Sequence, residues 1–115
     1  MGKVKVGING FGRIGRIAFR IGLLKHGDEI EFSAINTSGS MDTFGWAHLT
    51  NYDTTYRKFE LEVKSEEVKT PDKVTDEDPL IGYLIVQERG LKIPVLSQKD
   101  PAKIPWSKYG VDVVA

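Results

Sequence analysis

Apolar and polar residues alternate at the start of the chain and then change their period. Val4, Val6 and Ile8 alternate with polar or small residues, which predicts a short strand that lies centrally in a sheet and ends in a glycine-rich turn. Alternation over residues 29–36 predicts a second strand. Between them, apolar residues recur every three or four positions, which predicts an amphipathic helix that packs on the sheet through Ile14, Ile17, Ala18, Ile21 and Leu24.

Further elements follow this strand-helix-strand unit. Ser40 is predicted to cap a second, short helix that ends near Thr50. Alternation returns over residues 59–63, and residues 64–78, which are rich in lysine and glutamate, are predicted to form an exposed excursion. The predicted second helix is therefore followed by a less regular part of the chain.

Two apolar runs in the last third predict a β-hairpin. Residues 80–86 and 91–96 flank a turn in which Gly90 is expected to take a positive φ, and Pro94 is expected to place its strand at a sheet edge. A short helical or turn segment over residues 100–106 then precedes a last strand at 111–115.

The order of these elements predicts an α/β fold. We expect a Rossmann-type, mainly parallel sheet that forms the first mononucleotide-binding half, with an antiparallel hairpin inserted between about residues 59 and 96. Because the last parallel strand has no following helix to cover it, residues 1–115 are interpreted as a partial dinucleotide-binding domain without a catalytic domain. Such a half sheet exposes an edge and a face, so we expect self-association or a complementing catalytic chain.

The run Gly10-Phe11-Gly12-Arg13-Ile14-Gly15 matches the G-x-G-x-x-G motif, directly after a predicted strand and at the start of a helix. The first glycine permits a tight turn, the second lets the backbone approach a pyrophosphate, and the third lets helix and strand pack closely. Free N–H groups at the helix start would then face the phosphates. This context favours a dinucleotide site over a simple strand-to-helix connection.

The second predicted strand ends in Asn36-Thr37-Ser38. A dinucleotide fold normally places an Asp or Glu there, about 20 residues beyond the glycines, to hold the ribose hydroxyls. A neutral Thr37 would not repel a 2′-phosphate, so the site is predicted to accept NADP as well as NAD. The alternative is that Asn36 or Ser38 only builds the turn.

Composition narrows the classes of function. Sixteen Lys and Arg residues balance sixteen Asp and Glu residues, so no uniform positive field would attract nucleic acid or an anionic membrane. The aromatic and basic residues at positions 52–59 are accordingly interpreted as packing and not as a nucleic-acid platform. No apolar stretch approaches the ~20 residues of a membrane span and no secretory signal opens the chain, which makes the cytoplasm the expected location.

A longer string carries a family resemblance. Residues 5–16, KVGINGFGRIGR, resemble the opening of glyceraldehyde-3-phosphate dehydrogenases, and matches follow in order at 34–36, 47–54 and 100–106. The resemblance implies a glycolytic oxidoreductase, typically homotetrameric, that uses NAD or NADP. It also implies the cofactor contacts: backbone groups around the pyrophosphate and nearby ribose from Asn9, Phe11, Arg13 and Ile14, and Lys99 at the adenine.

The chain departs from this family at three places along its sequence and also in its catalytic residues. Thr37 replaces the usual Asp, Tyr56-Arg57 replaces a common His-Gly, and the stretch between Phe59 and Ser97 is longer than typical. The family also attacks its aldehyde substrate with a cysteine thiolate assisted by a histidine, whereas the chain has no cysteine, and His26 and His48 match neither catalytic position.

We therefore expect no catalytic residue in the chain and predict that it is inactive alone. No metal site is expected either, because Asp76-Glu77-Asp78 lacks the spacing of a calcium loop and is interpreted as a solvated acidic loop. The alternative is a stand-alone nucleotide-binding or regulatory module without enzymatic activity.

Overall fold

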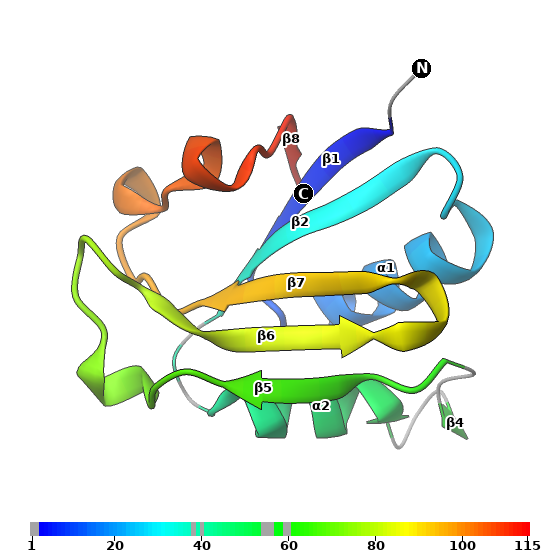
Figure 1. Cartoon of the computed structure of the whole chain (residues 1–115), viewed down its shortest axis with the longest axis horizontal. Coiled ribbons are helices and arrows are strands. Elements are labelled where there is room, and N and C mark those ends of the chain that lie inside the picture. The colour runs from blue at the N-terminus through cyan, green and yellow to red at the C-terminus, as the bar shows by residue number, and fades with distance from the viewer. Residues whose placement is uncertain (1–2, 38, 40, 54–56, 59–60) are drawn as a thin grey trace.

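The structure is a computed structural model that describes residues 3–37, 39, 41–53, 57–58 and 61–115. Its main sheet has the strand order β5-β6-β7-β2-β1-β8 (Figure 1). A separate short pair, β3 with β4, is antiparallel. The strands are β1 (Val4–Asn9), β2 (Ile30–Asn36), β3 (Tyr52–Asp53), β4 (Arg57–Lys58), β5 (Lys64–Glu67), β6 (Leu80–Val86), β7 (Leu91–Leu96) and β8 (Val113–Val114).

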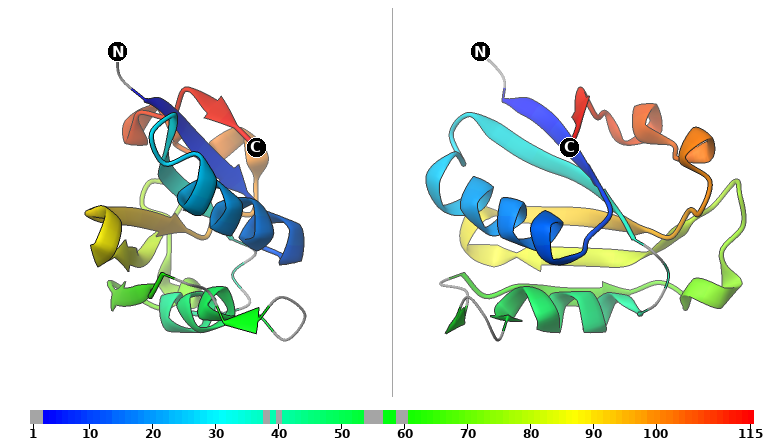
Figure 2. Two further views of the ribbon diagram at one scale, coloured as in Figure 1. Left: turned by 90° about the vertical axis from the view of Figure 1, so that its right-hand side faces the viewer. Right: turned by 180° about the vertical axis from the view of Figure 1, so that it is seen from behind.

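The parallel part of the sheet confirms the Rossmann-type α/β prediction. β1 pairs in parallel with β2 and with β8, and β2 pairs in parallel with β7. β1 is therefore central, as its apolar alternation predicted. α1 (Arg13–Lys25) connects β1 to β2, and α2 (Thr43–Asn51) follows β2. Both helices lie on the same face of the sheet (Figure 2).

The inserted antiparallel hairpin is also confirmed. β6 pairs with β7 through the short 3₁₀ turn η2 (Gln87–Arg89), and Gly90 closes it at φ 65°. The position of the hairpin differs from the prediction, because β7 lies between β6 and β2 and not at an edge. β2 pairs with β7 only at Val95 and Leu96, so Pro94, which lacks an N–H, lies just before that pairing begins.

One edge of the sheet is formed by β5, within the stretch expected to be an exposed excursion. Lys64–Glu67 pair antiparallel with β6, and three of the four residues are exposed. The alternation over residues 59–63 does not correspond to a strand in its described part, 61–63; residues 59 and 60 lie outside the described residues. Charged residues on an edge strand discourage pairing with other chains, which explains why this strand lacks an apolar pattern.

The buried face of α1 differs from the predicted one. Phe19 and Leu23 are buried in the core, whereas Ile14 is 83% exposed and Ile21 is 46% exposed. The helix approaches the sheet through Gly15 and Gly22: a Cβ on Gly22 would overlap the ring of Phe32 on β2. The glycine side thus faces the strands, and Ile14 and Ile21 face outward. Ile17 is half-buried, and Leu24 packs against the core as predicted.

The start of α2 is fixed by two carboxylates. Asp42 Oδ1 accepts the N–H of Gly45 at 2.8 Å, and Glu67 Oε1 on β5 accepts the N–H of Phe44 at 2.6 Å. Asp42 therefore occupies the capping position, one residue before the helix begins at Thr43. Ser40, the predicted cap, lies outside the described residues.

Consecutive strand residues contribute to two different apolar clusters. Ile35 and Val95 face the helices, together with Phe11, Phe19 and Trp46. Ala34 and Leu96, which alternate with them, face the opposite side and contact Ile104 and the residues around η4 (Trp106–Tyr109). The sheet thus has helices on one face and the segment with η3 (Pro101–Lys103) and η4 over part of the other.

Candidate nucleotide-binding site

The glycine-rich loop connects the carboxyl end of β1 to the start of α1. Gly10 has φ +96°, a left-handed conformation that favours glycine, and its N–H donates to Asn36 O at 2.9 Å. A Cβ on Gly15 would overlap the Gly10 carbonyl oxygen, so the third glycine lets the helix approach the loop. These two glycines are therefore required by the backbone itself.

Gly12 occupies a different environment in the same loop. It caps α1 with an extended backbone at φ −72°, and a Cβ built on it would have no heavy atom within 4 Å. Neither the fold nor the backbone conformation demands glycine here. An open surface at a glycine is what the close approach of a ligand requires.

The start of α1 is suited to an anion. Its capping residue offers no side-chain hydrogen bond, and its first turn contains no acidic residue. The first N–H groups of a helix lack intrahelical acceptors and carry the positive end of the helix dipole. Phosphate is the kind of ligand that such a terminus accommodates.

Three residues of the motif are placed around this start. The side chain of Phe11 is buried in the core against Phe19 and Trp46, so only its backbone could face a ligand. Ile14 projects into solvent from the first turn of α1. Arg13 begins the helix, and its side chain lies outside the described part of the chain.

A cavity of about 290 Å³ adjoins the loop at the carboxyl ends of the parallel strands. It brings together five residues predicted from sequence: Asn9, Gly10, Asn36, Thr37 and Lys99. Three further lining residues were missed: Gln98, Pro101 and Ile104. The signal for Gln98 was its position beside Lys99, whereas nothing in the apolar pattern separated Ile104 from a core residue.

Asn36 ties three parts of the cavity wall together. Its Nδ2 donates to Asn9 Oδ1 at 3.1 Å and to Gln98 O at 2.9 Å, while its Oδ1 accepts the Gln98 N–H at 2.9 Å. Asn36 is buried. Asn36 therefore helps to build the turn, as the alternative interpretation holds. The same hydrogen bonds orient Asn9 and Gln98 at the cavity.

Thr37 is only 2% exposed and is bound to β7. Its N–H and its hydroxyl both donate to Leu96 O, at 2.8 Å and 2.9 Å. Because the hydroxyl hydrogen is used within the protein, the Thr37 side chain could only accept a hydrogen bond from a ligand. No carboxylate stands at the end of β2, as the sequence predicted.

The remaining candidate residues lie elsewhere. His26 pairs with Glu29 at 3.4 Å beyond the end of α1, and the His48 ring stacks on Phe44 within α2. Among the described residues no group of His, Cys, Asp or Glu side chains could hold a metal ion. No helix of the described chain is long and apolar enough to cross a membrane.

Comparison with known proteins decides the family. The model for the NAD binding domain of glyceraldehyde 3-phosphate dehydrogenase matches residues 4–115. The chain belongs to the glyceraldehyde-3-phosphate dehydrogenase family. Its match is to the NAD-binding domain of that family, in agreement with the glycine-rich loop and the parallel sheet.

Bacterial members of the glyceraldehyde-3-phosphate dehydrogenase family resemble the chain along nearly its whole length. It is 42% identical to glyceraldehyde-3-phosphate dehydrogenase 2 of Bacillus subtilis over 97% of the chain and 27% of that protein. It is 43% identical to the Streptomyces coelicolor enzyme over 96% of the chain and 27% of that protein, and 43% identical to glyceraldehyde-3-phosphate dehydrogenase A of Escherichia coli over 97% and 28%. The chain thus spans about a quarter of the length of these relatives.

Proposed function

We propose that the chain binds a nicotinamide dinucleotide, NAD or NADP, as the cofactor-binding part of a glyceraldehyde-3-phosphate dehydrogenase-like glycolytic oxidoreductase. The observation that carries the proposal is the open surface at Gly12, which is the N-cap of α1 and lies two residues after Gly10 in the wall of the cavity at the strand ends. A pyrophosphate fits the N-terminus of α1, and an adenosine fits the cavity.

The chain's own residues have distinct parts in this binding. Backbone groups of Gly10, Phe11, Gly12, Arg13 and Ile14 hold the pyrophosphate at the start of α1. The adenosine lies in the cavity, where Asn9, Asn36, Thr37 and Lys99 line the wall. When bound, the nicotinamide group supplies hydride transfer, while the protein orients it.

Cofactor preference follows in part from Thr37. Its uncharged side chain does not repel a 2′-phosphate, which supports NADP as a ligand beside NAD. Its hydroxyl oxygen can accept a hydrogen bond from a ribose hydroxyl, whose hydrogen is free to donate.

Catalysis requires groups that the printed sequence does not contain. The family's chemistry uses a cysteine thiolate, and the chain has no cysteine. We therefore propose that the chain alone does not turn over substrate, that it is a partial dinucleotide-binding domain, and that it works with a chain or segment bearing the nucleophile. Self-association and a cytoplasmic location belong to the same proposal.

Titration by calorimetry tests this function. The chain is titrated with NAD and with NADP, beside a Gly12→Val variant. Because a Cβ at Gly12 meets no protein atom within 4 Å, the variant is expected to stay folded and to lose only about 1 kcal/mol, the cost of an apolar residue at a helix N-cap, but to bind either nucleotide at least about tenfold more weakly. Equal binding by the variant would contradict the proposed placement of the pyrophosphate.

The alternative is a stand-alone nucleotide-binding or regulatory module. The carboxylate caps of α2 and the continuous core favour a chain that folds without help. A monomer that binds nucleotide without a second polypeptide would favour this alternative. Recovery with a cysteine-bearing chain of the same family would favour the first function.

A further inference from the structure

A second cavity, of about 310 Å³, lies beside the proposed adenosine cavity. The two share Gln98 and Lys99 in their walls. The rest of the second cavity comes from Ser97 and from the excursion between β5 and β6, which contributes Pro71 and Asp76. The excursion includes the 3₁₀ turn η1 (Pro71–Lys73).

The turn after β2 touches this second cavity. A Cβ on Gly39, two residues beyond Thr37, would lie 2.7 Å from Ser97 Oγ and 3.9 Å from Pro71 Cβ. In dinucleotide folds the adenosine ribose hydroxyls lie at the carboxyl end of the second strand. The second cavity is thus on the side where a 2′-phosphate would project.

Asp76 connects the excursion to the 3₁₀ turn η3 and to the residues that follow β7. Its Oδ2 forms an ion pair with Lys103 Nζ at 2.9 Å, and its Oδ1 accepts from Gln98 Nε2 at 3.4 Å. Hydrogen bonds from Lys103 and Gln98 lower the pKa of Asp76, and the bond to Asp76 raises the pKa of Lys103, so both groups are charged at neutral pH.

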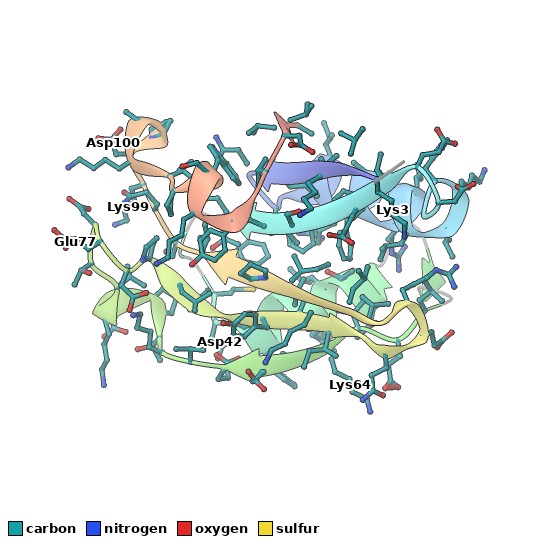
Figure 3. The ribbon with its side chains drawn as sticks, turned by 45° about the horizontal axis from the view of Figure 1, so that its top comes forward. Lys3, Asp42, Lys64, Glu77, Lys99 and Asp100 are labelled. Carbon is teal, nitrogen blue, oxygen red and sulfur yellow. The ribbon has the colours of Figure 1, made fainter. Side chains whose placement is uncertain are left out.

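Several carboxylates surround Lys103. Lys103 lies near the carboxylates of Asp100 and Glu77 as well as that of Asp76. Figure 3 shows Glu77, Lys99 and Asp100 gathered at one end of the molecule. A 2′-phosphate would carry additional negative charge toward Asp72 and Asp76, the two carboxylates in the wall of the second cavity, and Lys103 is already paired with Asp76.

We propose that Asp76 sets a preference for NAD over NADP at this site. Its carboxylate supplies, from the excursion, the negative charge that an Asp or Glu at the end of the second strand supplies in other dinucleotide folds and that Thr37 does not carry. It also keeps Lys103 in an ion pair and so withholds that cation from a 2′-phosphate. This inference rests on the proposed dinucleotide binding.

Dissociation constants for NAD and NADP in the wild-type chain and in Asp76→Asn test the proposal. The wild-type chain is expected to prefer NAD, and the ratio Kd(NADP)/Kd(NAD) is expected to fall about threefold to tenfold in the variant at low ionic strength, and by less in concentrated salt. Lys103→Met is expected to raise the ratio, because it removes a cation and leaves Asp76 unpaired.

Asp78→Asn is the matched control. Asp78 lies two residues after Asp76 and pairs with Lys69. It is not among the described residues that line either cavity. A wild-type preference for NADP, an unchanged ratio in Asp76→Asn, or an equal shift in Asp78→Asn would overturn the inference while leaving dinucleotide binding intact. Binding of neither nucleotide by the wild-type chain would overturn both the proposed function and this inference.

Discussion

At the scale of single residues, Gly12 and Gly15 are in the same motif but meet different constraints. A Cβ on Gly15 would overlap the Gly10 carbonyl oxygen and lie 3.4 Å from a side-chain carbon of Ile8, whereas a Cβ on Gly12 meets nothing within 4 Å. The first constraint belongs to folding. The second position is open, as the proposed approach of a pyrophosphate requires.

Gly15→Ala is therefore expected to destabilise the chain by about 2–3 kcal/mol, because the backbone of α1 must shift away from the loop. Urea unfolding measures the change. Gly12→Ala is the matched control and is expected to cost less than about 1 kcal/mol. Equal losses in the two variants would mean that helix packing does not distinguish the two glycines.

Much of the candidate site was predictable at this scale. The motif spacing identifies Gly10, Gly12 and Gly15, and the end of the second strand identifies Asn36 and Thr37. Their internal hydrogen bonds could not be predicted, because Gln98 reaches Asn36 only after β7 pairs with β2, and that pairing joins segments about 60 residues apart.

At the scale of elements, the two helices are joined by a buried arginine. Arg20 on α1 donates from Nε to Thr50 O at 2.9 Å and from Nη2 to Asn51 O at 3.3 Å, at the carboxyl end of α2. The guanidinium thus binds carbonyl oxygens that have no intrahelical partner and carry the negative end of the helix dipole. Asn51 continues the connection through two hydrogen bonds with the backbone of Val63.

Arg20→Met is expected to destabilise the chain by about 2–3 kcal/mol, because buried carbonyl oxygens lose a charged donor while the apolar stem is kept. The substitution should also accelerate amide hydrogen exchange more in α2 than in α1. Lys25→Met, in the exposed last turn of α1, is the control and is expected to change neither quantity. Unchanged protection of α2 in Arg20→Met would show that the arginine does not hold this helix.

The elements show where periodicity alone is insufficient. The isoleucines of α1 repeat at helical spacing, yet Phe19 and Leu23 form the buried face with Gly15 and Gly22. A helix that packs closely on strands does so through small residues, so the motif's third glycine already marked the inner side. For β5 no apolar signal existed, because charged residues protect an edge strand.

At the scale of the whole molecule, the sheet ends in two unlike edges. β5 presents Lys64–Glu67, whose charges oppose the addition of another strand. β8 presents Val113 and Val114, which are 55% and 44% exposed. The fold class was predictable because β1, α1 and β2 follow strong local rules. How the sheet is completed depends on surfaces that local patterns do not describe.

The β8 edge leads to a prediction about assembly. An apolar edge strand with free backbone groups favours pairing with another copy of the chain, so sedimentation equilibrium is expected to show an average mass that rises with concentration. Val114→Lys should shift the equilibrium toward monomer, because a lysine at an edge must be desolvated on pairing. Ile21→Lys, which alters the exposed side of α1, is the control for a helix-mediated contact. If Ile21→Lys dissociates the assembly and Val114→Lys does not, the interface lies on α1. A chain that stays monomeric at every concentration rules out an interface at β8 and an interface on α1.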